Sequence, residues 1–245
     1  MGKQTGDSSP RGWLFVFEGI DGSGKTTQMR CVAQALRKRQ LHVVELFEPT
    51  KGRFGQQVRT LLQLLNKQRQ QVSSDQALEV MELFIRDRMD DVEHNIGPAL
   101  ERGDIVLLDR YYFSTIAYQG AHGLDLEMIR QRNEQFAPLP DLVLYFAMPV
   151  EPALARIERD YRAPDLFDQH YEVAESRPTA ISRSIRVFER RDFLRRVKAI
   201  YDDLAQRLPY FHTIDATRDE QTIAREVLRA IDQRIAQKRM MNDEL

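Results

Sequence analysis

The residues between Gly19 and Thr27 have types and a spacing that suit the binding of a phosphate group. They read Gly-Ile-Asp-Gly-Ser-Gly-Lys-Thr-Thr and fit the pattern G-x-x-x-x-G-K-[ST]. Glycines let the backbone turn so that successive N–H groups face one anion, and a helix beginning at Lys25 adds its partial positive charge. The stretch therefore predicts a nucleoside triphosphate site rather than the alternative, a glycine-rich turn without a ligand. The residues expected to hold the triphosphate are Gly19, Ile20, Asp21, Gly22, Ser23, Gly24, Lys25, Thr26 and Thr27.

A second group of polar residues begins at Asp109, where an apolar run of strand length ends. In a loop of this type the lysine, Lys25, reaches the outer phosphates and the hydroxyl of Thr26 occupies one position on Mg²⁺. A carboxylate at the end of a neighbouring strand suits the same ion, so we expect Thr26 and Asp109 to hold Mg²⁺. Arg110 would face the transferred phosphoryl group or the phosphate of an acceptor, where its planar fork is valuable. The alternative is an Asp helix cap followed by a surface arginine.

Two weaker patterns suggest a site for the acceptor. Phe84 and Arg88 are four residues apart, so a nucleobase could stack on the ring while the guanidinium donates to a ring carbonyl. The alternative is a core aromatic beside a solvated arginine. The loop 48–52, Glu-Pro-Thr-Lys-Gly, follows another predicted strand, and Glu48 could shape a rigid turn there. Arg59 lies one to two turns into the next helix, where it could equally be an exposed helix charge.

The segment 160–187 is the least regular part of the sequence and leads into a run of basic residues. Between residues 177 and 196 there are seven arginines against two acidic residues, in a chain of net charge −1. Such runs are usually solvated faces. Here the run follows the fourth predicted strand and its helix, where a closing lid would neutralise a transferring phosphoryl group and exclude water. The sequence therefore predicts an arginine-rich lid at about 156–187.

Composition argues against several other classes of protein. The 245 residues are 42% hydrophobic and 30% charged, and the net charge of −1 gives no overall field for a nucleic acid. No stretch reaches transmembrane length, and residues 1–12 lack the apolar core of a secretory signal. The single cysteine, Cys31, excludes an internal disulfide and agrees with a reducing compartment. We therefore expect a cytoplasmic enzyme that binds neither nucleic acid nor membrane.

Apolar runs of strand length alternate with helical patterns, which is typical of a parallel α/β sheet. The predicted strands are 13–18, 41–47, 104–109, 141–147 and 210–214. The predicted helices are 25–39, 53–65, 75–102, 125–135, 151–160, 188–207 and 218–239, with a bend or restart at Pro98. These elements predict a single doubly wound α/β domain at 13–239, with a five-stranded parallel sheet flanked by helices, between tails at 1–12 and 240–245. Ligands bind outside the carboxyl ends of such strands.

The combination of these motifs resembles the thymidylate kinases, a family of P-loop nucleoside monophosphate kinases. The matching segments are 17–27, 48–50, 83–88, 109–119 and 140–145, in this order along the chain. Many NTPases share the phosphate loop, so the segment from Asp109 to Gln119, with Asp-Arg-Tyr at its start and Ala-Tyr-Gln at its end, is the more specific match. The resemblance implies transfer of the γ-phosphate of ATP to the 5′-phosphate of dTMP, dependence on Mg²⁺, and a homodimer.

The resemblance also implies roles for individual residues on the acceptor side. Phe84 would stack on thymine, and Arg88 would address its O4 atom. Arg59 and Arg110 would hold the phosphate of the acceptor, and Glu48 would be among the substrate-binding residues.

Further implied roles concern the sugar, the base and the reacting phosphates. Tyr118 would lie near the sugar, and Thr115 and Gln119 near the base. Asp21 falls at an acidic position of the loop that the family uses near the acceptor sugar and the metal. The catalytic residues implied in this way are Lys25, Asp21, Arg110, Arg156 and Arg159.

Three features depart from the usual family pattern. Phe47 precedes Glu-Pro where bacterial relatives often have arginine, so one phosphate contact is missing or supplied elsewhere. The phosphate loop contains no arginine, which assigns the catalytic arginine to the lid. The lid is also longer than usual across 160–186. The candidate lid arginines are Arg156, Arg159, Arg162, Arg183 and Arg186.

Three other functions remain as alternatives. A related kinase could act on another pyrimidine nucleotide or on an unphosphorylated deoxynucleoside, because a pocket for the thymine methyl group contributes only about 1–3 kcal/mol. A P-loop protein could use ATP as a switch without a small acceptor, although the residue types of 109–119 suit such an acceptor. A divergent copy could use its expanded lid for binding more than for catalysis.

Overall fold

A parallel five-stranded sheet forms the centre of the protein. The computed structural model describes residues 11–68, 72–162 and 180–243. The strands are β1 (Trp13–Glu18), β2 (Val43–Phe47), β3 (Ile105–Asp109), β4 (Leu142–Ala147) and β5 (Phe211–Asp215). Their order is β2-β3-β1-β4-β5 and each neighbouring pair is parallel, which confirms the predicted fold class. Four of the strands begin one or two residues after their predicted starts.

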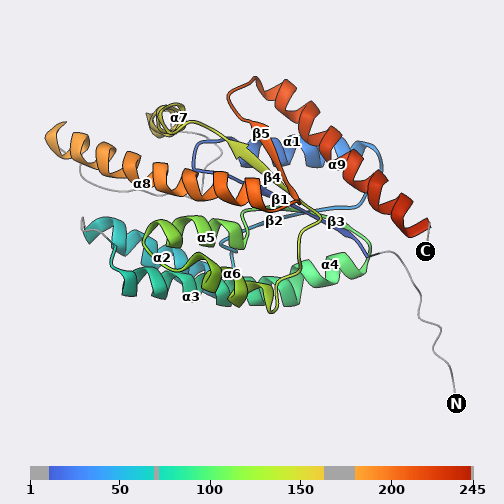
Figure 1. The fold of residues 1–245 in the computed structure, drawn as a ribbon, viewed down its shortest axis with the longest axis horizontal. Helices are drawn as coiled ribbons and strands as arrows, with labels where there is room; N and C mark the ends of the chain where they lie inside the picture. The colour runs from blue at the N-terminus through green and yellow to red at the C-terminus, as the bar shows by residue number, and fades with distance from the viewer. Residues whose placement is uncertain (1–10, 69–71, 163–179, 244–245) are drawn as a thin grey trace, which may run out of the picture.

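Helices cover both faces of this sheet. They are α1 (Lys25–Lys38), α2 (Arg53–Gln68), α3 (Ser74–Asp91), α4 (Gly97–Glu101), α5 (Tyr112–Ala121), α6 (Leu126–Glu134), α7 (Val150–Arg162), α8 (Ala180–Arg207) and α9 (Glu220–Asp243). Helices α1 and α9 lie against one face, while α5 and α8 pack together on the other (Figure 1). Because the sheet is covered on both sides, β1, β3 and β4 are apolar and buried along almost their whole length.

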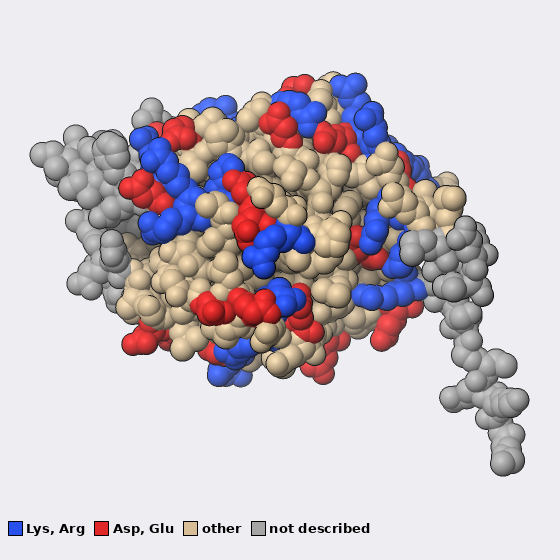
Figure 2. Space-filling model, in the orientation of Figure 1, with Lys and Arg blue, Asp and Glu red and all other residues tan. Residues whose placement is uncertain are grey.

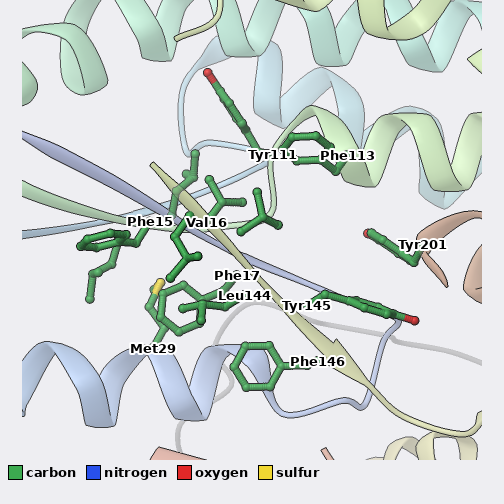
Figure 3. Close-up of a cluster of buried hydrophobic side chains, with 14 of the residues drawn as sticks. Phe15, Val16, Phe17, Met29, Tyr111, Phe113, Leu144, Tyr145, Phe146 and Tyr201 are labelled. Carbon is green, nitrogen blue, oxygen red and sulfur yellow. The ribbon is translucent and has the colours of Figure 1, made fainter. Parts of the chain in front are cut away.

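The core is built around β1 and β4. Phe15 and Phe17 of β1 have no exposed surface, and the ring of Phe17 stacks on Phe146 of β4 with 5.8 Å between the centroids. Met29 of α1 belongs to the same cluster (Figure 3). This packing fixes the point at which β1 ends and the loop from Gly19 begins.

The strand register brings the carboxyl ends of β1, β2 and β3 together. Asp109, at the end of β3, is paired with Phe17 on one side and with Phe47 on the other. Glu48 and Arg110 follow these strands directly, so they emerge at the same edge as the glycine-rich loop. The polar residues singled out in the sequence therefore lie where ligands of such sheets bind.

The predicted helix at 75–102 is divided into three parts. Helix α3 ends at Asp91, a π-helical turn covers Val92–Ile96, and α4 starts at Gly97. Pro98 lies in the first turn of α4, where its missing N–H costs least. Residues 74–101 are helical without a break, which agrees with the predicted helix at 75–102, and the bend or restart expected at Pro98 takes the form of the π-helical turn just before it.

The sequence does not predict helix α5. It begins with aromatic and β-branched side chains, which have low helix propensity. Its N-terminus is stabilised from outside, because Oε1 of Glu18 accepts hydrogen bonds from the backbone N–H groups of Tyr111 and Ser114 at 2.8 and 3.1 Å. Burial raises the pKa of Glu18, while the charge of Arg110 and the hydrogen bonds oppose that shift. A buried carboxylate on β1 is thus the cap of α5.

The ends of the last two long helices also differ from the prediction. Helix α8 begins at 180 rather than 188, and α9 covers 220–243 rather than 218–239. The predicted lid at 156–187 includes 163–179, which lies outside the described residues.

Charges of both signs occur side by side on the surface. Figure 2 shows Lys and Arg interspersed with Asp and Glu over the displayed face, so their fields partly cancel there. Among the helices described, none is long and apolar enough to cross a membrane.

Candidate active site

Three glycines give the loop after β1 its shape. Gly19, Gly22 and Gly24 have φ angles of 146°, 78° and 90°, a region that other residues rarely adopt. A Cβ atom at Gly22 would also lie 2.5 Å from the carbonyl oxygen of Ala153 in α7. Gly24 is the N-terminal cap residue of α1. The loop therefore ends at a helix N-terminus, which is the arrangement that binds phosphate groups.

Lys25, the first residue of α1, is almost completely buried. Its Nζ atom donates hydrogen bonds to the carbonyl oxygen of Ile20 at 3.0 Å and to Ser23 Oγ at 3.5 Å. Burial and the charge of Arg110 lower the pKa of Lys25 to about 8, against the opposing effect of nearby carboxylates. The ammonium group is thus folded over the loop on neutral oxygens, and a phosphate oxygen would offer it stronger, charge-assisted hydrogen bonds.

Thr26 and Asp109 are in direct contact. The hydroxyl of Thr26 donates a hydrogen bond to Asp109 Oδ2, and Asp109 is 6% exposed. Mg²⁺ commonly binds one or two protein oxygens together with phosphate oxygens and water, and this hydroxyl–carboxylate pair has the right donor atoms. Within the described ranges, no group of three or more His, Cys, Asp or Glu is arranged to hold a metal. The two predicted metal residues thus fit an ion held jointly with a triphosphate, and their binding of Mg²⁺ stays a prediction.

Arg110, the first residue after β3, has a φ angle of 71°, in the left-handed region. Its Nη2 donates to Asp21 Oδ1 at 2.5 Å, and its Nη1 donates to Ser114 Oγ at 3.0 Å and to the carbonyl oxygen of Gly19 at 3.4 Å. The guanidinium also lies over the ring of Tyr118, 5.4 Å from its centroid. Arg110 therefore connects the phosphate loop with the segment that leads into α5.

Arg88 of α3 lies in a fully buried polar cluster. Its Nε donates to both carboxylate oxygens of Glu48 at 3.0 Å, and its Nη2 donates to Glu48 Oε2 at 2.5 Å. Nη1 donates to Asn133 Oδ1 of α6 at 2.5 Å, and Nη2 also donates to Thr115 Oγ1 at 3.2 Å. Burial raises the pKa of Glu48, and Arg88 opposes that shift. These bonds use four of the five guanidinium N–H groups, so the predicted bond to a base can involve only the second hydrogen of Nη1.

Gln119 lies one turn after Thr115 on α5, so the two side chains share a face. Gln119 is 5% exposed, and its Oε1 has no hydrogen-bond partner in the part of the chain that the structure describes. A buried amide oxygen without a donor is costly, and the predicted contact of Gln119 with a base would supply one; that contact stays a prediction. Burial raises the pKa of Tyr118, the preceding residue, so its hydroxyl is neutral. Phe84 is half-buried, which leaves part of its ring available for stacking.

Arg59 of α2 stabilises the loop after β2. Its Nη1 and Nη2 donate to the carbonyl oxygens of Thr50 and Pro49, both at 2.5 Å. Thr50 in turn donates from its N–H and its hydroxyl to the carboxylate of Asp87 at 2.7 and 2.6 Å. The peptide bond between Glu48 and Pro49 is cis. The alternative of Arg59 as a merely exposed helix charge is wrong, and its contact with a phosphate stays a prediction.

Arg156 and Arg159 lie on α7, at the start of the predicted lid. Arg156 is half-buried and donates from Nη2 to the carbonyl oxygen of Ala216 at 3.2 Å. Its Nη1 is 3.8 Å from the position that a Cβ atom would take at Gly24, so it lies beside the phosphate loop. Arg159 is exposed. Of the five candidate lid arginines, the other three are Arg162, Arg183 and Arg186, and their side chains lie outside the described residues.

The sequence did not identify every residue that organises the site. Asp87 accepts a hydrogen bond from Thr50, and Asn133 accepts one from Arg88. The hydroxyl of Tyr201 donates to Glu18 Oε2 at 2.7 Å. A carboxylate at the end of an apolar strand, directly before the loop, was an available signal for Glu18. The other residues carry no local signal, because their partners are far away in the sequence.

Comparison with known proteins identifies the family of this chain. A family model described as thymidylate kinase matches residues 17–227. The chain belongs to the thymidylate kinase family. A thymidylate kinase of Desulfotalea psychrophila is 38% identical over 226 residues, which cover 92% of this chain and 97% of that protein. One from Akkermansia muciniphila is 46% identical over 155 residues, 61% and 71% of the two chains. A probable thymidylate kinase of Archaeoglobus fulgidus is 32% identical over 219 residues, 89% and 94% of the two chains.

Membership of the thymidylate kinase family confirms the resemblance found in the motifs. It identifies the protein as a phosphotransferase of the P-loop kinase class, with a single α/β domain. The matched range includes every residue of the site described above. The roles of individual residues remain predictions, which the geometry makes specific.

Proposed function

We propose that this protein transfers the γ-phosphate of ATP to dTMP and forms dTDP and ADP. The observation that carries the proposal is the ion pair between Arg110 and Asp21, at 2.5 Å. It joins a phosphate-binding loop to the segment that leads into α5, where Thr115 and Gln119 lie. A donor site and an acceptor site thus meet at the carboxyl ends of β1 and β3.

On the donor side, the backbone N–H groups of residues 19–24 and the ammonium of Lys25 bind the triphosphate. The N-terminus of α1 adds positive charge at the same position. Thr26 and Asp109 hold Mg²⁺, which when bound supplies charge neutralisation on the phosphates. Arg156, beside Gly24, adds positive charge near the transferring phosphoryl group.

On the acceptor side, Arg110 and Arg59 bind the phosphate of dTMP. Phe84 stacks on the thymine ring, which contributes about 1–3 kcal/mol. The second Nη1 hydrogen of Arg88 donates to O4 of the base. Gln119 Oε1, which is buried without a donor in the described structure, accepts the N3–H of thymine.

These contacts make phosphoryl transfer a matter of positioning and charge. An oxygen of the dTMP 5′-phosphate forms a bond to the γ-phosphorus of ATP. The bond between that phosphorus and the β–γ bridging oxygen breaks, and its electron pair leaves with ADP. Arg110 and the lid arginines stabilise the charge that spreads over the transferring group.

The acceptor profile tests the proposal. Steady-state assays with dTMP, dUMP, dCMP and thymidine should give the highest kcat/KM for dTMP, with dUMP slower by about tenfold because it lacks the methyl group. An inert dTMP would contradict the proposal. ATP turnover that ignores all four acceptors but responds to a protein partner would instead identify a switch.

A lysine pair on one helix tests the donor site. Lys25→Ala should reduce kcat by about a hundredfold or more, as expected when a donor to the transferring group is removed. Lys38→Ala, in the exposed last turn of α1, is the matched control and should leave kcat unchanged. Full activity of the Lys25→Ala variant would rule out the donor site.

The protein acts in the cytoplasm as a homodimer in this proposal. Helices α2 and α3 pack together and expose apolar side chains, Leu64 at 52%, Leu78 at 40% and Met89 at 50%. Leu78 and Met89 are about three turns apart and so share a face of α3. Leu78→Glu should shift the sedimentation coefficient to that of a monomer, whereas Leu139→Glu, at an exposed loop position, should not.

The proposed catalytic domain extends over 13–239 and its lid over 156–187. A variant lacking 160–186 tests the lid. This variant should still bind dTMP and ATP in calorimetry. Its rate of phosphoryl transfer to dTMP should fall, and the ratio of ATP hydrolysis by water to that transfer should rise. Unchanged transfer would assign this segment to a role outside catalysis.

A further inference from the structure

The carboxylate of Glu18 joins three elements of the fold. Besides capping α5 through Oε1, it accepts hydrogen bonds at Oε2 from the hydroxyl groups of Ser114 and Tyr201, both at 2.7 Å. The two hydroxyl oxygens are 2.9 Å apart. Glu18 lies in β1, Ser114 in α5 and Tyr201 in α8, and Tyr201 has no exposed surface. The cluster therefore holds α5 and α8 against the end of β1.

The direction of the hydrogen bonds leads from this cluster to Arg110. Nη1 of Arg110 donates to Ser114 Oγ at 3.0 Å. A guanidinium can only donate, and the hydroxyl of Ser114 donates to Glu18 Oε2, so the hydrogen of Ser114 points to Glu18 and its lone pair faces Arg110. Tyr201 supplies the second hydrogen at Oε2 and holds the carboxylate in the orientation that Ser114 needs.

We propose that Tyr201 is a positioning residue for Arg110 and acts through Glu18 and Ser114. The inference rests on the proposed function, because it takes the phosphate of dTMP as the group that Arg110 binds. Tyr201 touches no reacting atom. It fixes the hydrogen-bond chain that sets the direction of the guanidinium.

The other contacts of Arg110 fix its guanidinium less firmly. Its ion-pair partner Asp21 is 44% exposed, and pairs with such exposure contribute little. The hydrogen bond to the carbonyl oxygen of Gly19 is long, at 3.4 Å. The contact with the Tyr118 ring, 5.4 Å from its centroid, supports the guanidinium from one side. The hydrogen bond to Ser114 connects Arg110 to Glu18 and Tyr201, which have no exposed surface, so the direction of Nη1 depends on that network.

Tyr145 of β4 provides a matched control. Its ring stacks on that of Tyr201 with 5.4 Å between the centroids, and it is equally buried. Its hydroxyl donates to Asp202 of α8 at 2.8 Å, so it also joins a carboxylate and the same helix. The two hydroxyl groups point in opposite directions (Figure 3), and only that of Tyr201 reaches Glu18.

Each of the changes Tyr201→Phe and Tyr145→Phe removes one hydroxyl group from a buried side chain. With one hydrogen bond lost, we expect Tyr201→Phe to lower kcat/KM for dTMP by about three- to tenfold, through a higher KM and a lower kcat, because Arg110 contacts both the acceptor and the transferring group. KM for ATP should change by less than about twofold. Tyr145→Phe should leave both KM values within about twofold of wild type. Equal effects of the two changes, or a rise in KM for ATP alone, would overturn the proposal.

A double variant tests whether Tyr201 acts through Arg110. In an Arg110→Ala background, Tyr201→Phe should cause no further loss of kcat/KM for dTMP, because the residue to be positioned is gone. A further loss as large as that in the wild-type background would show another route and would contradict the proposal.

Urea unfolding separates this inference from the proposed function. If the wild type does not use dTMP, the proposed function fails, yet the hydrogen-bond chain can still be measured. Arg110→Ala and Tyr201→Phe together should destabilise the protein by less than the sum of the single changes, whereas Arg110→Ala and Tyr145→Phe should be additive. Additivity in both pairs would overturn the link between Tyr201 and Arg110.

Discussion

Arg88 and Glu48 form a buried ion pair that joins helix α3 to the loop after β2. Nη2 of Arg88 is 2.5 Å from Oε2 of Glu48, and the two side chains are only 1% and 2% exposed. Such a pair is costly to break, because the remaining partner is left as a buried charge. The pair therefore holds Arg88 in place and also leaves one of its N–H groups for a ligand.

Glu48→Gln should weaken both stability and acceptor binding. We expect the free energy of unfolding to fall by about 3–5 kcal/mol in urea titrations above pH 8, where Glu48 is ionised despite its raised pKa, since Arg88 loses its counter-charge. KM for dTMP should rise more than KM for ATP, because Arg88 is then free to turn.

Glu82→Gln is the matched control for this change. It breaks the ion pair between Glu82 and Arg132, whose side chains are 35% and 39% exposed. An exposed pair contributes about 1 kcal/mol or less, so little stability should be lost and KM for dTMP should not change. If Glu48→Gln cost no more than Glu82→Gln, the Arg88–Glu48 pair would not organise the site.

Asp91, at the end of α3, gives a pH-dependent prediction. It is 2% exposed, and its Oδ2 has no hydrogen-bond partner in the described part of the chain. Burial raises its pKa to about 6, with Asp87 and Asp90 adding to the shift and Asn95 and Arg88 opposing it. A folded-state pKa above the unfolded one means that ionised Asp91 destabilises the protein at neutral pH.

Asp91→Asn should therefore stabilise the protein at pH 7.5 by up to about 3 kcal/mol, the equivalent of a shift of about two pKa units. The gain should shrink as the pH falls through 6 and vanish below about pH 3, where Asp91 is protonated in both the folded and the unfolded state. Urea unfolding at several pH values measures it. Asp90→Asn, at a neighbour that is 48% exposed, should give a small effect without this pH dependence. A gain that is constant with pH would contradict the assignment to Asp91.

The contiguous motifs could be predicted from the sequence, because their geometry depends on local backbone rules. The glycines at 19, 22 and 24 need a left-handed or open φ, and Lys25 and Thr26 follow at a fixed spacing. The apolar runs also predicted the sheet, since strands covered on both faces must be apolar throughout. The contact of Thr26 with Asp109 follows from the order of the strands.

Features that depend on distant partners could not be predicted. Helix α5 has weak propensity and forms under the cap supplied by Glu18, which is distant in sequence. Glu48, Arg88 and Thr115 were each assigned to the substrate from their motifs, but nothing local shows that they bond to one another. Tyr201 lies on α8, where a sequence pattern cannot distinguish a core tyrosine from one that organises a site.

The contact between Thr26 and Asp109 predicts the metal requirement. Thr26→Val keeps the shape of the side chain but removes the oxygen, so the Mg²⁺ concentration for half-maximal activity should rise by about tenfold or more. Thr26→Ser should retain the wild-type requirement. Thr60→Val, which removes a hydroxyl bonded to the carbonyl oxygen of Gln56 on α2, controls for loss of a hydroxyl alone. An unchanged Mg²⁺ titration for Thr26→Val would remove Thr26 from the metal site.

A comparison of Gly24 with Gly123 separates the stability cost of a left-handed backbone from its effect on ATP binding. Both have a positive φ, 90° and 97°, and a Cβ atom would meet only Arg156 Nη1 at 3.8 Å in the first case and nothing within 4 Å in the second. Steric clash is therefore small at both sites, and each change to alanine should cost about 1–2 kcal/mol in urea unfolding because of the left-handed backbone.

Gly24 also sets the direction of the N–H groups at the start of α1, whereas Gly123 lies in the turn after α5. Gly24→Ala should thus weaken ATP binding in calorimetry by about tenfold or more, and Gly123→Ala should leave it unchanged. Equal ATP affinity in the two variants would mean that the loop does not need this φ to hold the phosphates.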